Sequence, residues 1–118
     1  MREPPAIDGF GGGGFRVAGV WRPGSLLILA DEPRHWRPTT LAELTLDDLE
    51  LVLAAPAGTV EFVLLGTGPT QSLPPRSIRD ALRSASLGLE FMATGAAVKL
   101  HNVLASEGRL FATALIAI

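Results

Sequence analysis

The sequence predicts a single α/β domain with a mixed sheet and helices mainly on one face. Two strand–helix–strand units follow one another over residues 60–92 and 89–118, and such units place parallel strands side by side through right-handed crossovers. The first third of the chain has the short alternating runs of antiparallel strands. With 118 residues, of which 47% are hydrophobic and 19% charged, the chain is expected to form one domain, 1–118, with residues 1–5 as a flexible tail.

The N-terminal third contains three predicted strands. Residues 15–20 and 25–30 are expected to pair as a hairpin, because Trp21-Arg22-Pro23-Gly24 between them has Pro-Gly turn chemistry. A shorter strand is expected at 6–10, ended by four consecutive glycines. Residues 31–40 hold two prolines and several charges, so a loop is predicted there.

The middle of the chain is predicted to contain a helix, a buried strand and a second helix. Thr40 with Glu43 and Thr45 with Asp48 form overlapping capping-box patterns before a helix that ends at residues 56–58. The apolar run 60–65 predicts a strand buried on both faces. Pro74-Pro75 opens the second helix, for which Gly88 is the expected C-terminal cap. Its apolar stripe is Ile78, Ala81, Leu82 and Ala85.

The last part of the chain predicts a strand at 89–92, a third helix and a final strand at 110–118. Thr94 is expected to cap the third helix, which ends at Gly108. His101 flanks the expected buried stripe and is predicted to be a hydrogen-bonded residue at the boundary of the core. The predicted stripe is Ala97, Leu100, Val103 and Leu104.

Composition excludes several classes of function. The formal charge is −2, from 10 basic and 12 acidic residues, so no nucleic-acid partner is predicted. Cysteine is absent, which excludes disulfides and thiolate chemistry, and the two histidines are far apart in sequence. We predict no catalytic residues, no metal and no cofactor. The N-terminus lacks a signal-peptide pattern and residues 110–118 are too few to span a bilayer, so we expect a cytoplasmic protein without membrane insertion.

Two loops are candidate ligand sites because each follows a predicted parallel strand and precedes a helix. The first is Gly66-Thr67-Gly68-Pro69 and the second is Thr94-Gly95-Ala96-Ala97, with Lys99 one turn further on. Exposed backbone amides there would favour a carboxylate, sulfate or phosphate group. The alternatives are a tight turn for the first loop, and a helix cap with close helix–sheet packing for the second.

A row of arginines is the candidate partner site. Arg76, Arg79 and Arg83 share one face of the second predicted helix. Such a row is either a solvated helix face or a docking surface for an acidic partner.

Two motifs together are similar to those of a known family. They are Leu64-Leu65-Gly66-Thr67-Gly68, and Thr94-Gly95-Ala96-Ala97 followed by Asn102-x-Leu104 and Glu107-Gly108-Arg109. With this order, the chain resembles a family of small domains of unknown function from bacteria and archaea, which includes mitochondrial respiratory complex I assembly factor 3 and an adipogenesis-associated human protein.

The resemblance implies a three-layer α/β fold in which an N-terminal β-ribbon bends over the mixed sheet. The family has no established reaction, so it implies no catalytic residues. This chain has Ala93, Val98 and His101 where family members often have Asp, Cys and Tyr. Two functions are therefore expected as alternatives. One is a non-enzymatic accessory or assembly protein whose partner is a subunit of a membrane complex. The other is a domain that binds a small anion through loops 66–69 and 94–97.

Overall fold

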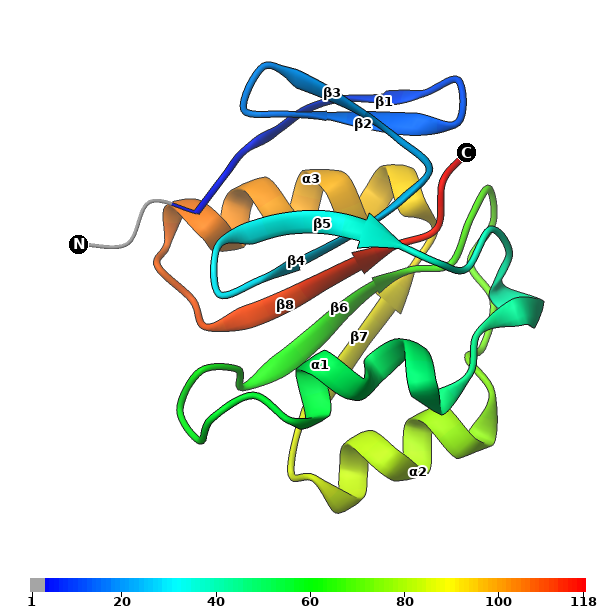
Figure 1. Cartoon of the computed structure of the whole chain (residues 1–118), viewed down its shortest axis with the longest axis vertical. Helices are drawn as coiled ribbons and strands as arrows, with labels where there is room; N and C mark the ends of the chain where they lie inside the picture. Colours follow the sequence, from blue (N-terminus) through cyan, green and yellow to red (C-terminus); the bar gives the residue numbers. More distant parts are fainter. Residues whose placement is uncertain (1–3) are drawn as a thin grey trace.

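The computed structural model describes residues 4–118, so most of the expected flexible tail, residues 1–3, lies outside the described part. Pro5, at the end of that tail, has its carbonyl oxygen 2.9 Å from His101 Nε2. Two sheets and three α-helices form three layers (Figure 1). The strands are β1 (Ile7–Gly11), β2 (Gly14–Val17), β3 (Val20–Pro23), β4 (Ser25–Leu29), β5 (Glu32–Trp36), β6 (Phe62–Gly66), β7 (Gly88–Met92) and β8 (Phe111–Leu115). The α-helices are α1 (Glu50–Leu53), α2 (Arg76–Ser84) and α3 (Thr94–Ser106).

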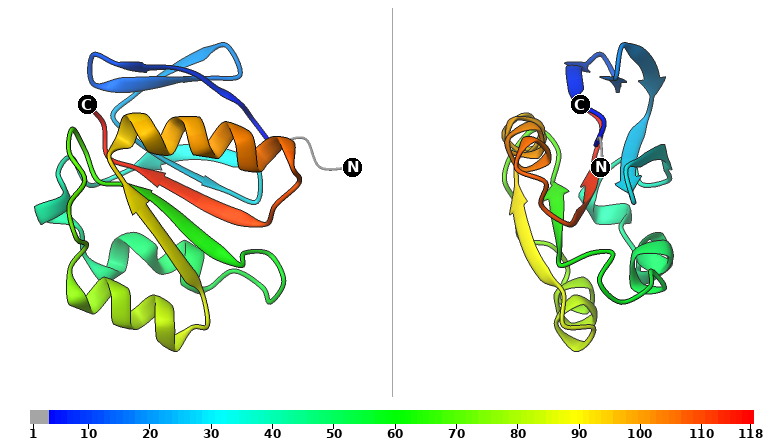
Figure 2. Two further views of the ribbon diagram at one scale, coloured as in Figure 1. Left: turned by 180° about the vertical axis from the view of Figure 1, so that it is seen from behind. Right: turned by 90° about the vertical axis from the view of Figure 1, so that its left-hand side faces the viewer.

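The larger sheet is mixed, as predicted. Its strand order is β5-β4-β8-β6-β7. β6 is parallel to both β7 and β8, whereas β4 is antiparallel to β5 and β8. β7 and β8 therefore share a direction, but β6 lies between them. The smaller sheet is an antiparallel ribbon of β1, β2 and β3 that lies across one face of the larger one (Figure 2).

Side chains alternate between the two faces of the larger sheet, because successive residues of a strand point in opposite directions. Leu27, Val63 and Leu65 pack with α1 and α2 on one face. Leu26, Ile28 and Leu64 pack with α3 and the ribbon on the other. The three-layer α/β fold and the bent ribbon are thus confirmed. The expectation of helices mainly on one face holds for α1 and α2, but α3 covers the opposite face.

The predicted hairpin between residues 15–20 and 25–30 is wrong. β2 instead pairs with β1 and β3, and Trp21, Arg22 and Pro23 belong to a strand rather than a turn. The turn lies earlier in the chain, where Ala18 and Gly19 have φ of 49° and 81°. Gly24, with φ of 84°, bends the chain from the ribbon into β4 of the other sheet.

The predicted loop at 31–40 is also wrong in its first half. β5 occupies Glu32–Trp36 and pairs with β4 through a tight turn at Ala30 and Asp31, whose φ values are 51° and 63°. Pro33 is tolerated because β5 is an edge strand, on which an N–H that faces away from the neighbouring strand takes part in no ladder hydrogen bond.

The first predicted helix is broken into short pieces. Two 3₁₀ helices, η1 (Leu41–Glu43) and η2 (Leu46–Leu49), precede α1, and Leu44 between them is extended with ψ of 127°. The Thr45–Asp48 capping box is confirmed, since the Asp48 carboxylate accepts hydrogen bonds from the Thr45 amide and hydroxyl. The Glu43 carboxylate binds Thr39 instead of Thr40.

The second and third predicted helices are present, with different details at their ends and faces. α2 ends before Ser86, which has φ of 60°, and Gly88 is the first residue of β7. The N-cap of α3 is Ala93, not Thr94. Its buried face is rotated from the predicted one, because His101 is buried whereas Val103 is exposed. α3 buries Thr94, Ala97, Val98, His101 and Leu104.

Candidate functional site

The two candidate ligand loops meet at one edge of the larger sheet, as predicted from their parallel strands. The Thr94 amide donates to the Gly68 carbonyl at 2.8 Å. The Thr94 hydroxyl accepts from the Gly68 amide at 3.0 Å and donates to the carbonyl of Ile116 at 2.8 Å. Thr94 is fully buried, so this hydroxyl joins three segments of the chain. The amides of Gly68 and Thr94, expected to face a ligand, donate within the protein instead.

Gly66 and Thr67 complete this junction. A Cβ at Gly66 would lie 2.8 Å from Leu115 Cδ2 and 2.9 Å from Thr94 Oγ1, so only glycine fits there. The buried Thr67 hydroxyl lies 2.7 Å from the Thr70 carbonyl and accepts from the Ser72 amide at 3.2 Å. These contacts are those expected of the tight-turn alternative.

The first turn of α3 lies beneath the ribbon. A Cβ at Gly95 would be 3.3 Å from the ring of Phe10, a residue of β1. Ala96 and Lys99 are exposed on the same helix. The sequence-predicted ligand residues are therefore close together, but the part near Gly95 is covered by an aromatic side chain. Anion binding by these loops stays a prediction.

The arginine row has one acidic neighbour for three guanidinium groups, so it keeps a net positive charge. Asp80 pairs with Arg76 at 3.6 Å and with Arg83 at 3.3 Å, and both arginines are well exposed. Arg79 donates from Nε to the Pro74 carbonyl at 3.1 Å. Because exposed ion pairs of this kind contribute little energy, the row is held loosely and remains available to a partner.

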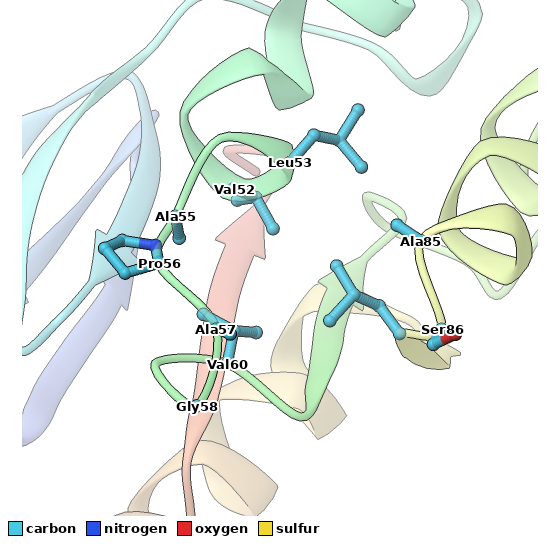
Figure 3. Close-up of a pocket in the computed structure, with 10 residues that line it drawn as sticks. Val52, Leu53, Ala55, Pro56, Ala57, Gly58, Val60, Ala85 and Ser86 are labelled. Carbon is cyan, nitrogen blue, oxygen red and sulfur yellow. The ribbon is translucent and has the colours of Figure 1, made fainter.

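A cavity of about 250 Å³ lies between the C-terminal ends of α1 and α2 (Figure 3). Its walls are mainly aliphatic side chains, including Val52, Leu53 and Val60, with Ser86 at one side. Helix-ending residues such as Pro56 and Gly58 marked this place in the sequence, but nothing marked it as hollow. Its lining offers no charged side chain, so it lacks groups for acid–base chemistry.

A larger cavity, about 400 Å³, lies where the ribbon meets the larger sheet. Arg22, Arg34 and His35 line it together with Trp21. Sequence analysis missed this cluster, because Arg22 was assigned to a turn and Arg34 to a loop. Only the two-sheet arrangement brings β3 and β5 together.

His101 is an ionisable side chain that lies in the core and lines neither cavity. Only 1% of its surface is exposed. Its Nε2 lies 2.9 Å from the Pro5 carbonyl and its Nδ1 lies 2.7 Å from Thr113 Oγ1. A carbonyl accepts only, so Nε2 carries the proton and Nδ1 accepts from the threonine hydroxyl. Burial lowers the pKa of His101, against the raising effect of the Pro5 hydrogen bond.

Across residues 4–118, no three His, Cys, Asp or Glu side chains gather closely enough to hold a metal ion. The same residues include no helix with the length and apolar character needed to cross a bilayer.

A family model described as a protein of unknown function (DUF498/DUF598) matches residues 7–116. The chain belongs to this family. The match starts in β1 and ends just after β8, so the ribbon and the mixed sheet are both part of the DUF498/DUF598 domain.

Similar proteins come from bacteria and from cattle. An uncharacterised protein of Rhodobacter capsulatus is 37% identical over 110 residues, 93% of this chain and 82% of the relative. Bovine NADH dehydrogenase [ubiquinone] 1 alpha subcomplex assembly factor 3 is 31% identical over 121 residues, 98% of this chain but 64% of that protein. The crystal structure of an outer membrane protein from Bartonella henselae is 34% identical, with a TM-score of 0.87 over 97% of this chain and 95% of that one.

Proposed function

We propose that this DUF498/DUF598 protein is a non-catalytic accessory protein that acts by binding another protein through its N-terminal ribbon. The observation that carries the proposal is a pair of exposed apolar side chains on β3, Val20 and Trp21, which are 58% and 51% exposed. β3 is an edge strand of the ribbon, so its outer side pairs with no strand among the described residues. Aromatic side chains such as that of Trp21 are enriched in protein interfaces.

One relative supports a role in assembly, because the bovine protein is by name an assembly factor of the NADH dehydrogenase [ubiquinone] 1 alpha subcomplex. The Bartonella relative, described as an outer membrane protein, supports an association with membranes. The proposed partner is a subunit of a membrane-bound complex, which the protein would contact from the cytoplasm. The arginine row on α2 is a second proposed contact, and it would meet an acidic surface of the same partner.

The test is affinity capture of the tagged protein from its own cells, compared among variants of matched chemistry. Val20→Asp places a charge on the proposed surface, whereas Val103→Asp places the same charge on α3, where the valine is 53% exposed. We expect Val20→Asp to lose a partner that Val103→Asp retains. If both variants capture the same proteins in the same amounts, the ribbon is not the contact surface and the proposal is wrong.

A third variant tests the arginine row separately. Gln replaces Arg76, Arg79 and Arg83 together, which removes the charges while keeping helix propensity. Loss of the same partner would place the row in the interface. Unchanged capture would restrict the interface to the ribbon.

A further inference from the structure

The cavity between the ribbon and the larger sheet has an unusual electrostatic lining. It is lined by residues on both sides of the bend from β3 into β4 and by Arg34 and His35 of β5. Figure 1 shows that this bend lies near the C-terminal end of β5. The bend packs closely on that strand, since a Cβ at Gly24 would lie 2.9 Å from His35 Cε1. Arg22 enters the lining from β3 and Arg34 from β5, so the two guanidinium groups come from different sheets.

Each of these two arginines has one buried donor that no acceptor in the described part of the protein reaches. The Nε atoms of Arg22 and Arg34 are buried and have no hydrogen-bond partner within the described part of the chain. They are the two side-chain atoms in residues 4–118 that are buried in this way. A buried donor without an acceptor is unfavourable, and the two arginines that have one both line the same cavity, which favours an acceptor that the protein itself does not supply.

Of the two arginines, Arg34 has an acidic partner and Arg22 has none among the described residues. Glu32 Oε2 lies 3.3 Å from Nη2 of Arg34, but the glutamate is 72% exposed and reaches only the far end of the guanidinium. Arg22 forms no ion pair with any described residue. By contrast, Arg16 pairs with Asp8 and Arg37 with Asp48.

We infer that this cavity is a binding site for an oxyanion, a carboxylate or phosphate group carried by a small molecule with a flat apolar part. A guanidinium presents its Nε–H and an Nη–H side by side, which matches the two oxygens of a carboxylate or phosphate. Trp21 and Leu26, which also line the cavity, give it an apolar wall. The volume of about 400 Å³ is within the range of small-molecule sites. This site is separate from loops 66–69 and 94–97, but it shares Val20 and Trp21 with the proposed protein-binding surface, so it goes beyond that proposal without depending on it.

The test is a titration of the purified protein followed by NMR of the arginine Nε–H groups, with Trp21 fluorescence as a second signal. The probes are benzoate and inorganic phosphate at constant ionic strength set with sodium chloride. Benzamide serves as the neutral analogue of benzoate. Arg22→Gln and Arg34→Gln each remove one guanidinium, and Arg16→Gln is the matched control because Arg16 lies on the adjacent strand outside the cavity lining.

We expect saturable shifts of the Arg22 and Arg34 Nε–H signals with at least one anion and none with benzamide. Affinity should fall about tenfold or more in either cavity variant and stay unchanged in Arg16→Gln. Tighter binding of phosphate than benzoate would identify a phosphate ester as the ligand class, and the reverse a carboxylate. Shifts that fail to saturate in the parent protein, or that Arg16→Gln weakens as much as Arg22→Gln, would overturn the inference. The parent titration decides the matter even if a variant fails to fold.

Discussion

Asn102 of α3 forms two hydrogen bonds with the backbone of Ile7 in β1. Its Nδ2 donates to the Ile7 carbonyl at 2.9 Å, and its Oδ1 accepts from the Ile7 amide at 2.9 Å. The side-chain amide of Asn102 thus makes the two backbone hydrogen bonds that a neighbouring strand would otherwise make with Ile7. These bonds lie where the ribbon crosses α3. Ile7 itself is buried, so the contact fixes an apolar side chain as well as a backbone direction.

Asn102→Ala should therefore loosen the ribbon. The change leaves a donor and an acceptor of Ile7 without partners in a part-buried place, and we expect the free energy of unfolding to fall by about 1–3 kcal/mol. Urea denaturation measures this fall. The control is Ser106→Ala on the same helix, since the Ser106 hydroxyl is exposed and bonds only to the Val103 carbonyl. Equal effects of the two changes would contradict a special role for Asn102.

Leu64→Ala tests the central strand. Leu64 is fully buried on β6, between β7 and β8. We expect the free energy of unfolding to fall by about 2–5 kcal/mol, as is usual when a buried leucine is shortened. Leu51→Ala is the matched control, because that leucine is about half-exposed on α1. A denaturation midpoint as close to the parent value for Leu64→Ala as for Leu51→Ala would mean that the sheet order is wrong.

Thr94→Val tests the junction between the two loops. Valine keeps the shape of threonine but has no hydroxyl, so the Gly68 amide and the Ile116 carbonyl each lose a partner. We expect a loss of about 1–3 kcal/mol in the free energy of unfolding. Thr94→Ser keeps the hydroxyl and should retain most of the stability. A serine variant as unstable as the valine variant would show that the methyl group, not the hydroxyl, matters.

The strand–helix–strand half of the fold could be predicted from the sequence because its signals are local. Apolar runs mark β6 and β8, and Pro74-Pro75 marks the start of α2. The ribbon could not be placed by such signals. The turn between β2 and β3 uses Ala18 at positive φ, where the usual turn residues are Gly, Asn or Asp. The nearby Pro-Gly pair gave a stronger and misleading turn signal.

The candidate sites, too, could be predicted from the sequence only where local patterns determine them. Parallel strands brought loops 66–69 and 94–97 together as expected, yet no pattern in the sequence indicated that the Thr94 hydroxyl would bridge them. Arg22 and Arg34 meet only because the chain changes sheets at Gly24. A contact between residues of two packed sheets leaves no repeating pattern in the sequence, so it could not be predicted from the sequence.

His101 makes stability depend on pH. The folded protein holds this side chain neutral, with Nε2–H bonded to the Pro5 carbonyl, and burial lowers its pKa. In the unfolded chain a histidine binds a proton near its usual pKa of about 6.5. The unfolded state therefore takes up a proton at a higher pH than the folded state, so protons favour unfolding.

We expect the free energy of unfolding to be constant above about pH 7 and to fall as the pH drops below about 6.5 toward the lowered pKa of the folded state. Urea denaturation between about pH 8 and pH 5 measures this, above the range in which carboxylates titrate. His101→Gln keeps a donor for Pro5 and an acceptor for Thr113 without a titrating ring, so its stability should vary much less over this interval. His35→Gln, at an exposed position, should retain the fall seen in the parent protein. If His101→Gln retains it too, another group is responsible and the assignment to His101 is wrong.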